Sequence, residues 1–227
     1  MKSLYPILIL SIYLLAGCAD KKDTPFEPGE VYFDYRVRGQ EENDNLLIRA
    51  QFRAGDEEGE AIQVIAPGFV SFDGEMLPAD STKMDGYYYE TFRPTHEFAG
   101  KHNIVYSDIK KKEYREEFEF KPFNISSALP DTLKRTDFEI TLDGVQDGEV
   151  LTLIMIDTSF ENGITRKEEI QDNQLRLTSE DLGNLAAGPV QLELIREEEI
   201  PVKNGTKAGG RILVVYSLKR EFILSDN

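Results

Sequence analysis

The feature that most constrains the fold is an alternation of apolar and polar residues with a period of two. Successive side chains of a β-strand point to opposite faces, so this alternation predicts strands with one face on a core and the other in water, as in antiparallel sheets. In the first half, the apolar positions are Phe33/Tyr35/Val37, Ile48/Ala50/Phe52, Val70/Phe72, Ile104/Tyr106 and Phe118/Phe120. Glycine- and aspartate-rich turn signals separate these segments.

The alternation stops after residue 123 and resumes at residue 138, which suggests a domain junction. Pro122 lies just before this interval, and Pro130 and small polar residues lie within it. In the second half, apolar runs recur at 150–156, 175–177, 190–194 and 212–224. Only residues 179–185 resemble a short helix, with Ser179 as the expected N-cap and acids in the first turn. We therefore predict an all-β protein with two antiparallel β-sandwiches, over residues 30–123 and 124–227.

A weak internal repeat links the two halves. Phe98-Ala99-Gly100 leads into the apolar positions of 102–106, and Ala186-Ala187-Gly188 leads into those of 190–194. Each segment is followed by a charged loop and a last long strand. This pattern resembles the penultimate and final strands of bacterial immunoglobulin-like domains and implies two tandem immunoglobulin-like sandwiches. The cysteine pair and core tryptophan of antibody domains are absent, so both cores would depend on apolar burial, at roughly 25 cal/mol per Å².

The amino-terminal segment is typical of an export signal. Lys2 is the only charge before Asp20, and the apolar run at 4–16 is shorter than the roughly 20 residues of a membrane-spanning helix. Leu15-Ala16-Gly17-Cys18 resembles the lipobox of bacterial lipoproteins. This resemblance implies that the signal peptide, residues 1–17, is removed and that Cys18 receives diacylglycerol and an amide-linked acyl chain such as palmitate. The alternative is a cysteine that occurs in an apolar leader by chance.

The predicted anchor also accounts for the cysteine content. Cys18 is the only cysteine, so no disulfide can form within the chain. Residues 18–29 are polar and contain two prolines, which predicts an extended lipidated tether. Ala19 differs from the aspartate that retains many lipoproteins in the inner membrane. We therefore expect a lipid-anchored protein of the outer membrane that faces the periplasm or the cell surface, with more than one acyl chain for stable anchoring.

The charge restricts the classes of partner. The chain has 42 acidic and 26 basic residues and a formal net charge of −16. So acidic a protein is not expected to bind nucleic acid phosphates. Attraction to anionic lipid headgroups is not expected either, so the predicted membrane contact runs through the lipid on Cys18.

The sequence contains no catalytic motif that we can recognise. A Gly-x-Ser-x-Gly elbow, a P-loop and a His-Glu-x-x-His pair are all missing, and the glycine-rich stretch 204–210 predicts a hairpin loop. His96 and His102 are too few for a zinc site without a free cysteine, and the acidic clusters do not have EF-hand spacing. We predict no enzymatic activity, no cofactor and no metal. A hydrolase that uses two carboxylates is the alternative.

Tyr87, Tyr88 and Tyr89 are the candidate binding residues. In a strand, the first and third rings share one face, and an exposed pair could stack on a sugar or anchor an interface. The alternative is that part of the triplet packs in the core. Lys110, Lys111 and Lys112 predict a solvated turn between two strands.

Two short patterns resemble the O-glycosylation sequon of exported proteins in some bacteria. They are Asp80-Ser81-Thr82 and Asp131-Thr132-Leu133, which would place glycans on Ser81 and Thr132.

Together these features predict a non-enzymatic cell-envelope lipoprotein that acts as a binding, spacer or assembly module. Its partner would be an envelope protein or a polysaccharide. The alternative function is a glycan-capturing accessory lipoprotein of an outer-membrane uptake system.

Overall fold

The protein is all-β, as predicted. The computed structural model describes residues 30–158 and 163–226, so the predicted signal peptide, Cys18 and the tether lie outside the described residues. The elements are β1 (Val31–Gln40), β2 (Asn45–Ala54), β3 (Phe69–Phe72), β4 (Glu75–Met76), β5 (Ala79–Thr82), β6 (Gly86–Pro94), η1 (Thr95–Glu97), β7 (Gly100–Ser107), β8 (Glu113–Phe120), β9 (Asn124–Ile125), β10 (Thr132–Leu133), β11 (Phe138–Asp143), β12 (Val150–Asp157), β13 (Gly163–Glu169), β14 (Gln174–Leu177), α1 (Ser179–Gly183), β15 (Gly188–Pro201) and β16 (Gly210–Leu224).

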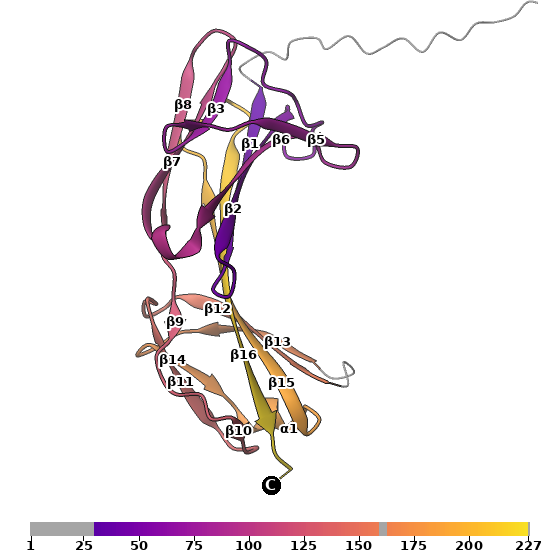
Figure 1. Cartoon of the computed structure of the whole chain (residues 1–227), viewed down its shortest axis with the longest axis vertical. Coiled ribbons are helices and arrows are strands. Elements are labelled where there is room, and N and C mark those ends of the chain that lie inside the picture. Colours follow the sequence, from indigo (N-terminus) through magenta and orange to yellow (C-terminus); the bar gives the residue numbers. More distant parts are fainter. Residues whose placement is uncertain (1–29, 159–162, 227) are drawn as a thin grey trace, which may run out of the picture.

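The upper lobe in Figure 1 is a sandwich of two sheets. One sheet contains the first half of β16 followed by β1, β2, β6 and β5, and the other has the order β4-β3-β7-β8. The apolar positions of the sequence alternation are buried between them, and Phe33, Ile48 and Phe72 are 0% exposed. The turn 108–112, which contains the lysine triplet, joins β7 to β8 as predicted.

The lower lobe is a second sandwich. Strands β13, β12 and β15, the second half of β16 and β10 face a small sheet with the order β14-β11-β9. The helix predicted at 179–185 forms as α1, but its N-cap is Thr178 rather than Ser179. The Thr178 hydroxyl accepts from the Asp181 amide at 3.0 Å, and the Asp181 carboxylate accepts from the Thr178 amide at 3.0 Å. This reciprocal capping box selects Thr178 because two amide donors at the helix start are satisfied at once.

The weak internal repeat of the sequence occupies equivalent backbone positions in the two lobes. Gly100 begins β7 with φ +122°, and Gly188 begins β15 with φ +119°. Residues with a side chain rarely adopt φ angles in this positive range, which explains why both strands begin at a glycine.

Strands β15 and β16 pass through both lobes and join them into one sheet. This sheet, called sheet A below, has the strand order β13-β12-β15-β16-β1-β2-β6-β5. Residues 210–217 of β16 pair in parallel with β1, and Ile223 and Leu224 pair in parallel with β10. The end of the chain therefore completes the upper sandwich. The domain boundary after residue 123 stays a prediction.

Contacts at the lobe junction add to the shared strands. The Arg196 side chain, on a residue that is 8% exposed, donates to the Lys121 carbonyl and, at 2.7 Å, to the Gly144 carbonyl. Arg220 of β16 donates twice to the carboxylate of Glu41, at 2.5 and 3.1 Å. Because these bonds connect groups from both lobes, they oppose bending at the junction.

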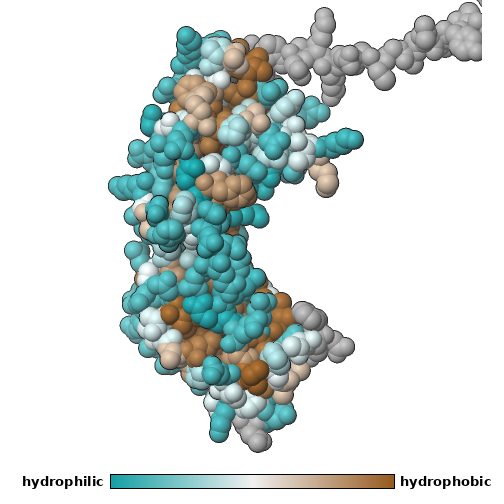
Figure 2. Space-filling view, viewed as in Figure 1, coloured by the Kyte–Doolittle hydropathy of each residue, from teal (hydrophilic) through white to brown (hydrophobic). Residues whose placement is uncertain are grey.

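The two lobes form a crescent along the long axis of the molecule. Strands β5, β6, β13 and β15 of sheet A lie on the inner side of the bend, whereas β7, β8, β9, β11 and β14 lie on the outer side (Figure 1). The space-filling view shows the hollow between the lobes on that inner side (Figure 2). The face of sheet A that points away from both cores therefore lines the hollow.

Candidate binding face

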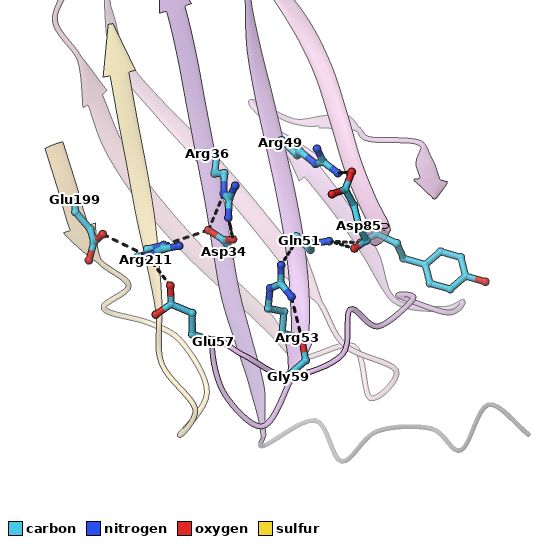
Figure 3. Close-up of polar contacts among 11 residues, drawn as sticks. Asp34, Arg36, Arg49, Gln51, Arg53, Glu57, Gly59, Asp85, Glu199 and Arg211 are labelled. Carbon is cyan, nitrogen blue, oxygen red and sulfur yellow. Dashed lines mark hydrogen bonds and ion pairs between the residues drawn. The ribbon is translucent and has the colours of Figure 1, made fainter. Parts of the chain in front are cut away.

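The outward face of sheet A in the upper lobe is rich in arginine. In β1 and β2, residues 33, 35, 37, 48, 50 and 52 are buried, and the residues between them point outward. Five of the twelve arginines of this acidic chain lie on the outward face, namely Arg36, Arg38, Arg49, Arg53 and Arg211. Four of them have partners within the protein (Figure 3).

Asp34 is the centre of one group of these contacts. This residue is 2% exposed, and its carboxylate accepts from Arg36 Nη2 at 2.6 Å and from Arg211 Nε at 3.3 Å. Arg211 also forms ion pairs with Glu57 at 2.7 Å and Glu199 at 3.5 Å. Burial by itself would raise the pKa of Asp34, but the hydrogen bonds and charges of the two arginines outweigh it, so the pKa lies below its ordinary value.

A second group of contacts fixes the arginines of β2. The Arg49 guanidinium lies 3.8 Å from the centre of the Tyr88 ring and forms an ion pair with Asp85 at 3.2 Å. Arg53 donates to Gln51 Oε1 at 2.7 Å and to the Gly59 carbonyl at 3.2 Å. Figure 3 shows these side chains side by side above neighbouring strands. Their role is to hold the face in one geometry, because their donors are already engaged.

Arg38 differs from the other four. It is exposed, and its side chain forms no hydrogen bond or ion pair with any residue in 30–158 or 163–226. Its cross-strand neighbours are Val215 on β16 and Leu47 on β2, both half-buried, and Leu47 in turn pairs with Phe92 on β6. Phe92 is 59% exposed. A free cation therefore lies within a row of apolar side chains.

The row continues diagonally into the lower lobe. On β15, Ile195 lies two residues before the residue that pairs with Val215. On β12, Ile154 lies two residues after the residue that pairs with Ile195. Both are half-buried. Six adjacent strands thus contribute one side chain each to what we call the stripe: Ile154, Ile195, Val215, Arg38, Leu47 and Phe92. At about 4.8 Å between neighbouring strands, the stripe extends about 24 Å across the six strands.

Most of the side chains beside the stripe are polar. Glu193 and Lys219, with their charged atoms 3.9 Å apart, lie on one side together with the apolar Ile156. The other side carries Glu197, Arg36, Arg49, Glu90 and the apolar Leu213. An apolar centre with a polar rim is typical of protein–protein interfaces, in which arginine and aromatic residues are enriched. The outward face of sheet A, which carries the stripe, lies on the inner side of the bend (Figure 1).

The tyrosine triplet contributes little exposed surface. Tyr89 is 4% exposed, packs edge-on against Phe52 and accepts from the Val64 amide at 2.8 Å. Tyr88 is 8% exposed and lies under Arg49, and Tyr87 is half-buried. Tyr89 therefore packs in the core, which was the alternative to an exposed triplet. Binding by these tyrosines stays a prediction.

The remaining candidates lie away from the stripe. The His102 ring stacks on Phe98 with centroids 3.8 Å apart, and its Nδ1 lies 2.7 Å from Asp73 Oδ2, so its contacts are structural. Ser81 on β5 and Thr132 on β10 are exposed, and their glycosylation stays a prediction, as does the lipidation of Cys18 outside the described residues.

The structure offers few other candidate sites within residues 30–158 and 163–226. In that part of the chain, no group of three or more His, Cys, Asp or Glu side chains could hold a metal ion, and no helix is long and apolar enough to cross a membrane. A pocket of about 570 Å³ lies at the lobe junction and is lined by Arg196, Tyr216 and Glu149 among others. Because Arg196 is engaged with Lys121 and Gly144, it holds the junction rather than a ligand.

Sequence reasoning missed the stripe, although one signal was present. Residues 150–156 and 212–215 are apolar on nearly every position, so both faces of these strands had to carry apolar side chains. The position of Arg38 among them depends on the register of β1 between β16 and β2, which no local pattern reveals.

Comparisons with known proteins give a likeness of fold only. No protein-family model and no curated protein matches the chain. Solved structures that match include DIP-gamma IG1+IG2, at 10% identity over 88% of this chain and 100% of that chain, with a TM-score of 0.24. Titin A168169 matches at 11% identity over 86% and 99%, with a TM-score of 0.24. The Bacteroides ovatus mixed-linkage glucan utilization locus protein SGBP-B matches at 13% identity over 90% of this chain and 46% of that chain, with a TM-score of 0.25.

These matches include chains with two immunoglobulin domains. Because the TM-scores are low, they carry no information about a site. The structure thus presents an all-β scaffold with an outward face on which four arginines are held by contacts within the protein.

Proposed function

We propose that the protein is a non-enzymatic, lipid-anchored binding module of the cell envelope, and that it docks its partner on the outward face of sheet A. The observation that carries this proposal is the stripe. Six apolar or cationic side chains follow one another across six strands on a face that covers neither core. Contiguous apolar surface of this kind marks interaction sites in soluble proteins.

The contacts of the arginines on this face support a binding role. Arg36, Arg49, Arg53 and Arg211 are held by carboxylates, carbonyls and a ring, so the surface around the stripe does not have to be ordered when a partner arrives. Ordering of side chains on association costs roughly 0.5–1.5 kcal/mol for each flexible side chain, so a pre-ordered face binds more tightly.

The anchoring part of the proposal rests on the lipobox resemblance at residues 15–18. We expect the wild-type protein in the membrane fraction of the native host and the Cys18→Ser variant in the soluble envelope fraction. Membrane retention of the variant in unchanged amount would show that another feature holds the protein there.

Photo-crosslinking in intact cells tests the binding part. p-Benzoylphenylalanine would replace Phe92 on the inner side of the crescent and, as a control, Met76 on β4 of the other sheet. The two positions are matched, because Phe92 is 59% and Met76 62% exposed. We expect an adduct from position 92 and none from position 76. An adduct from position 76 alone, or from neither position, would contradict the proposal.

Glycan capture has less support from the face. Sugars are held by flat aromatic rings with hydrogen-bonding groups around them, and Phe92 is the single exposed ring of the stripe. Tyr88 and Tyr89, the rings on which that alternative depended, are 8% and 4% exposed.

A further inference from the structure

The character of the stripe indicates what kind of partner it accepts. Resting on the proposed function, we infer that the stripe binds a protein partner that presents one carboxylate between apolar side chains, with the carboxylate on Arg38.

The charge of Arg38 carries this inference. Three of the other four outward arginines have acidic partners at 2.6–3.5 Å: Arg36 with Asp34, Arg49 with Asp85 and Arg211 with Glu199. Arg53 is held by Gln51 and the Gly59 carbonyl. The flanking side chains of Arg38 on the neighbouring strands are Val215 and Leu47, which cannot accept a hydrogen bond. Covering the stripe with a purely apolar surface would bury this guanidinium without a partner, which is costly. A carboxylate at that point satisfies it in bidentate fashion.

The neighbours of Arg38 decide between a protein and a polysaccharide. Ile154, Ile195, Val215 and Leu47 are aliphatic, and aliphatic side chains offer no flat face for a sugar ring. Apolar side chains of a protein pack against such residues, and arginine with an aromatic residue forms the usual centre of a protein interface.

A second copy of this chain is a poor occupant of the hollow. Two copies that faced each other with their long axes parallel would meet first at their tips, because the inner side is hollowed (Figure 2). Each chain also has a net charge of −16, which opposes self-association. A convex or elongated protein surface fits the hollow better.

The test repeats the crosslinking from position 92 in the full-length protein, in cells, with three further variants. Arg38→Glu reverses the charge, Arg38→Lys keeps it, and Lys101→Glu makes the same reversal at an exposed position of β7 on the other sheet. Thermal unfolding of the purified variants is measured alongside. We expect equal melting temperatures, because Arg38 and Lys101 are exposed.

The inference predicts a protease-sensitive adduct that falls about tenfold or more in Arg38→Glu and persists in Arg38→Lys and Lys101→Glu. Mass spectrometry should map it to a partner segment with an Asp or Glu among apolar residues. An adduct that is unchanged by Arg38→Glu, resists protease but not glycosidases, or joins two copies of this chain would overturn the inference and leave the binding role intact. Absence of any adduct from position 92 would overturn both.

Discussion

The two sheets of the upper lobe differ in the surface that they expose. On β8, Tyr114, Phe118 and Phe120 point into the core, and the alternate positions Glu113, Arg115, Glu117 and Glu119 are exposed and charged. On β2 of sheet A, Ile48 points into the core, but its neighbour Leu47 is also apolar and faces outward. Strand β8 follows the rule of an apolar inside and a polar outside except at the buried Glu116, whereas sheet A carries outward apolar side chains on adjacent strands along the stripe. The outward face of the sheet that contains β8 has apolar side chains as well, at Phe69, Met76 and Val105.

This difference separates the requirements of folding from those of binding. The inward alternation is sufficient for a sandwich core, since burial of those side chains stabilises the fold. An outward apolar stripe braced by arginines adds nothing to either core, so we attribute it to recognition. The variants below test whether the two faces of sheet A have these separate roles.

The largest contrast is expected between adjacent residues of β2. Ile48→Ala removes a side chain that is 0% exposed, and we expect the free energy of unfolding to fall by about 3 kcal/mol because a cavity is left in the core. Leu47→Ala, on the outward face, should cost less than about 1 kcal/mol. Urea unfolding monitored by circular dichroism measures both. Equal losses would show that Leu47 belongs to the folding core.

Asp34 tests the polar brace around the stripe. In Asp34→Asn, Arg36 and Arg211 lose their shared charged acceptor, so we expect a loss of about 2 kcal/mol in the free energy of unfolding. Glu117→Gln, an exposed change on β8, is the control and should leave the urea midpoint almost unchanged. If the two variants were equally stable, the contacts of Asp34 would not brace the face.

The pH dependence of the same pair gives an independent check. The pKa of Asp34 is lowered in the folded protein, so its stabilising effect is fully present above the unfolded-state pKa of about 4 and is lost as the pH falls through the folded-state pKa. The stability difference between the wild type and Asp34→Asn should be constant from pH 7 to pH 5 and shrink toward pH 2. Asp137 and Asp181 also have lowered pKa values, but they are common to both proteins and cancel in the difference. A stability difference between the two proteins that grew as the pH fell would contradict a lowered pKa of Asp34 in the folded protein.

A smaller contrast is expected within the tyrosine triplet. Tyr89→Phe removes the hydroxyl that accepts from the Val64 amide at 2.8 Å inside the upper lobe, and we expect a loss of about 1 kcal/mol. Tyr88→Phe keeps the ring under Arg49 on the outward face and should change the urea midpoint less. The reverse order would indicate that the two faces of β6 are assigned wrongly.

The strands and the core could be predicted from the sequence, because the period of two is a local property of each segment. Phe33, Ile48, Phe72 and Leu192 are all buried as expected. The helix cap was wrong by one residue because two neighbouring hydroxyl residues offer the same chemistry, and only the bond from Asp181 distinguishes them.

The joining of the lobes could not be predicted in the same way. Strand β16 pairs with β1, about 180 positions earlier in the sequence, and this pairing depends on the whole fold. The candidate site could not be predicted for the same reason. Arg38, Val215 and Phe92 are far apart in the sequence and become neighbours only through the register of four strands.

The occupation of the inner face in the cell is the central claim, and cysteine protection measures it without knowledge of the partner. Phe92→Cys and Met76→Cys would each be labelled with a maleimide that does not cross membranes, in intact cells if the chain faces outward or in opened envelopes if it faces the periplasm. The same labelling would be done on the purified proteins, with the wild type as the control for Cys18. We predict that Phe92→Cys is labelled several-fold more slowly in cells than in purified protein, whereas Met76→Cys is labelled equally in both. Equal labelling of Phe92→Cys in cells and in purified protein would contradict a docked partner on sheet A.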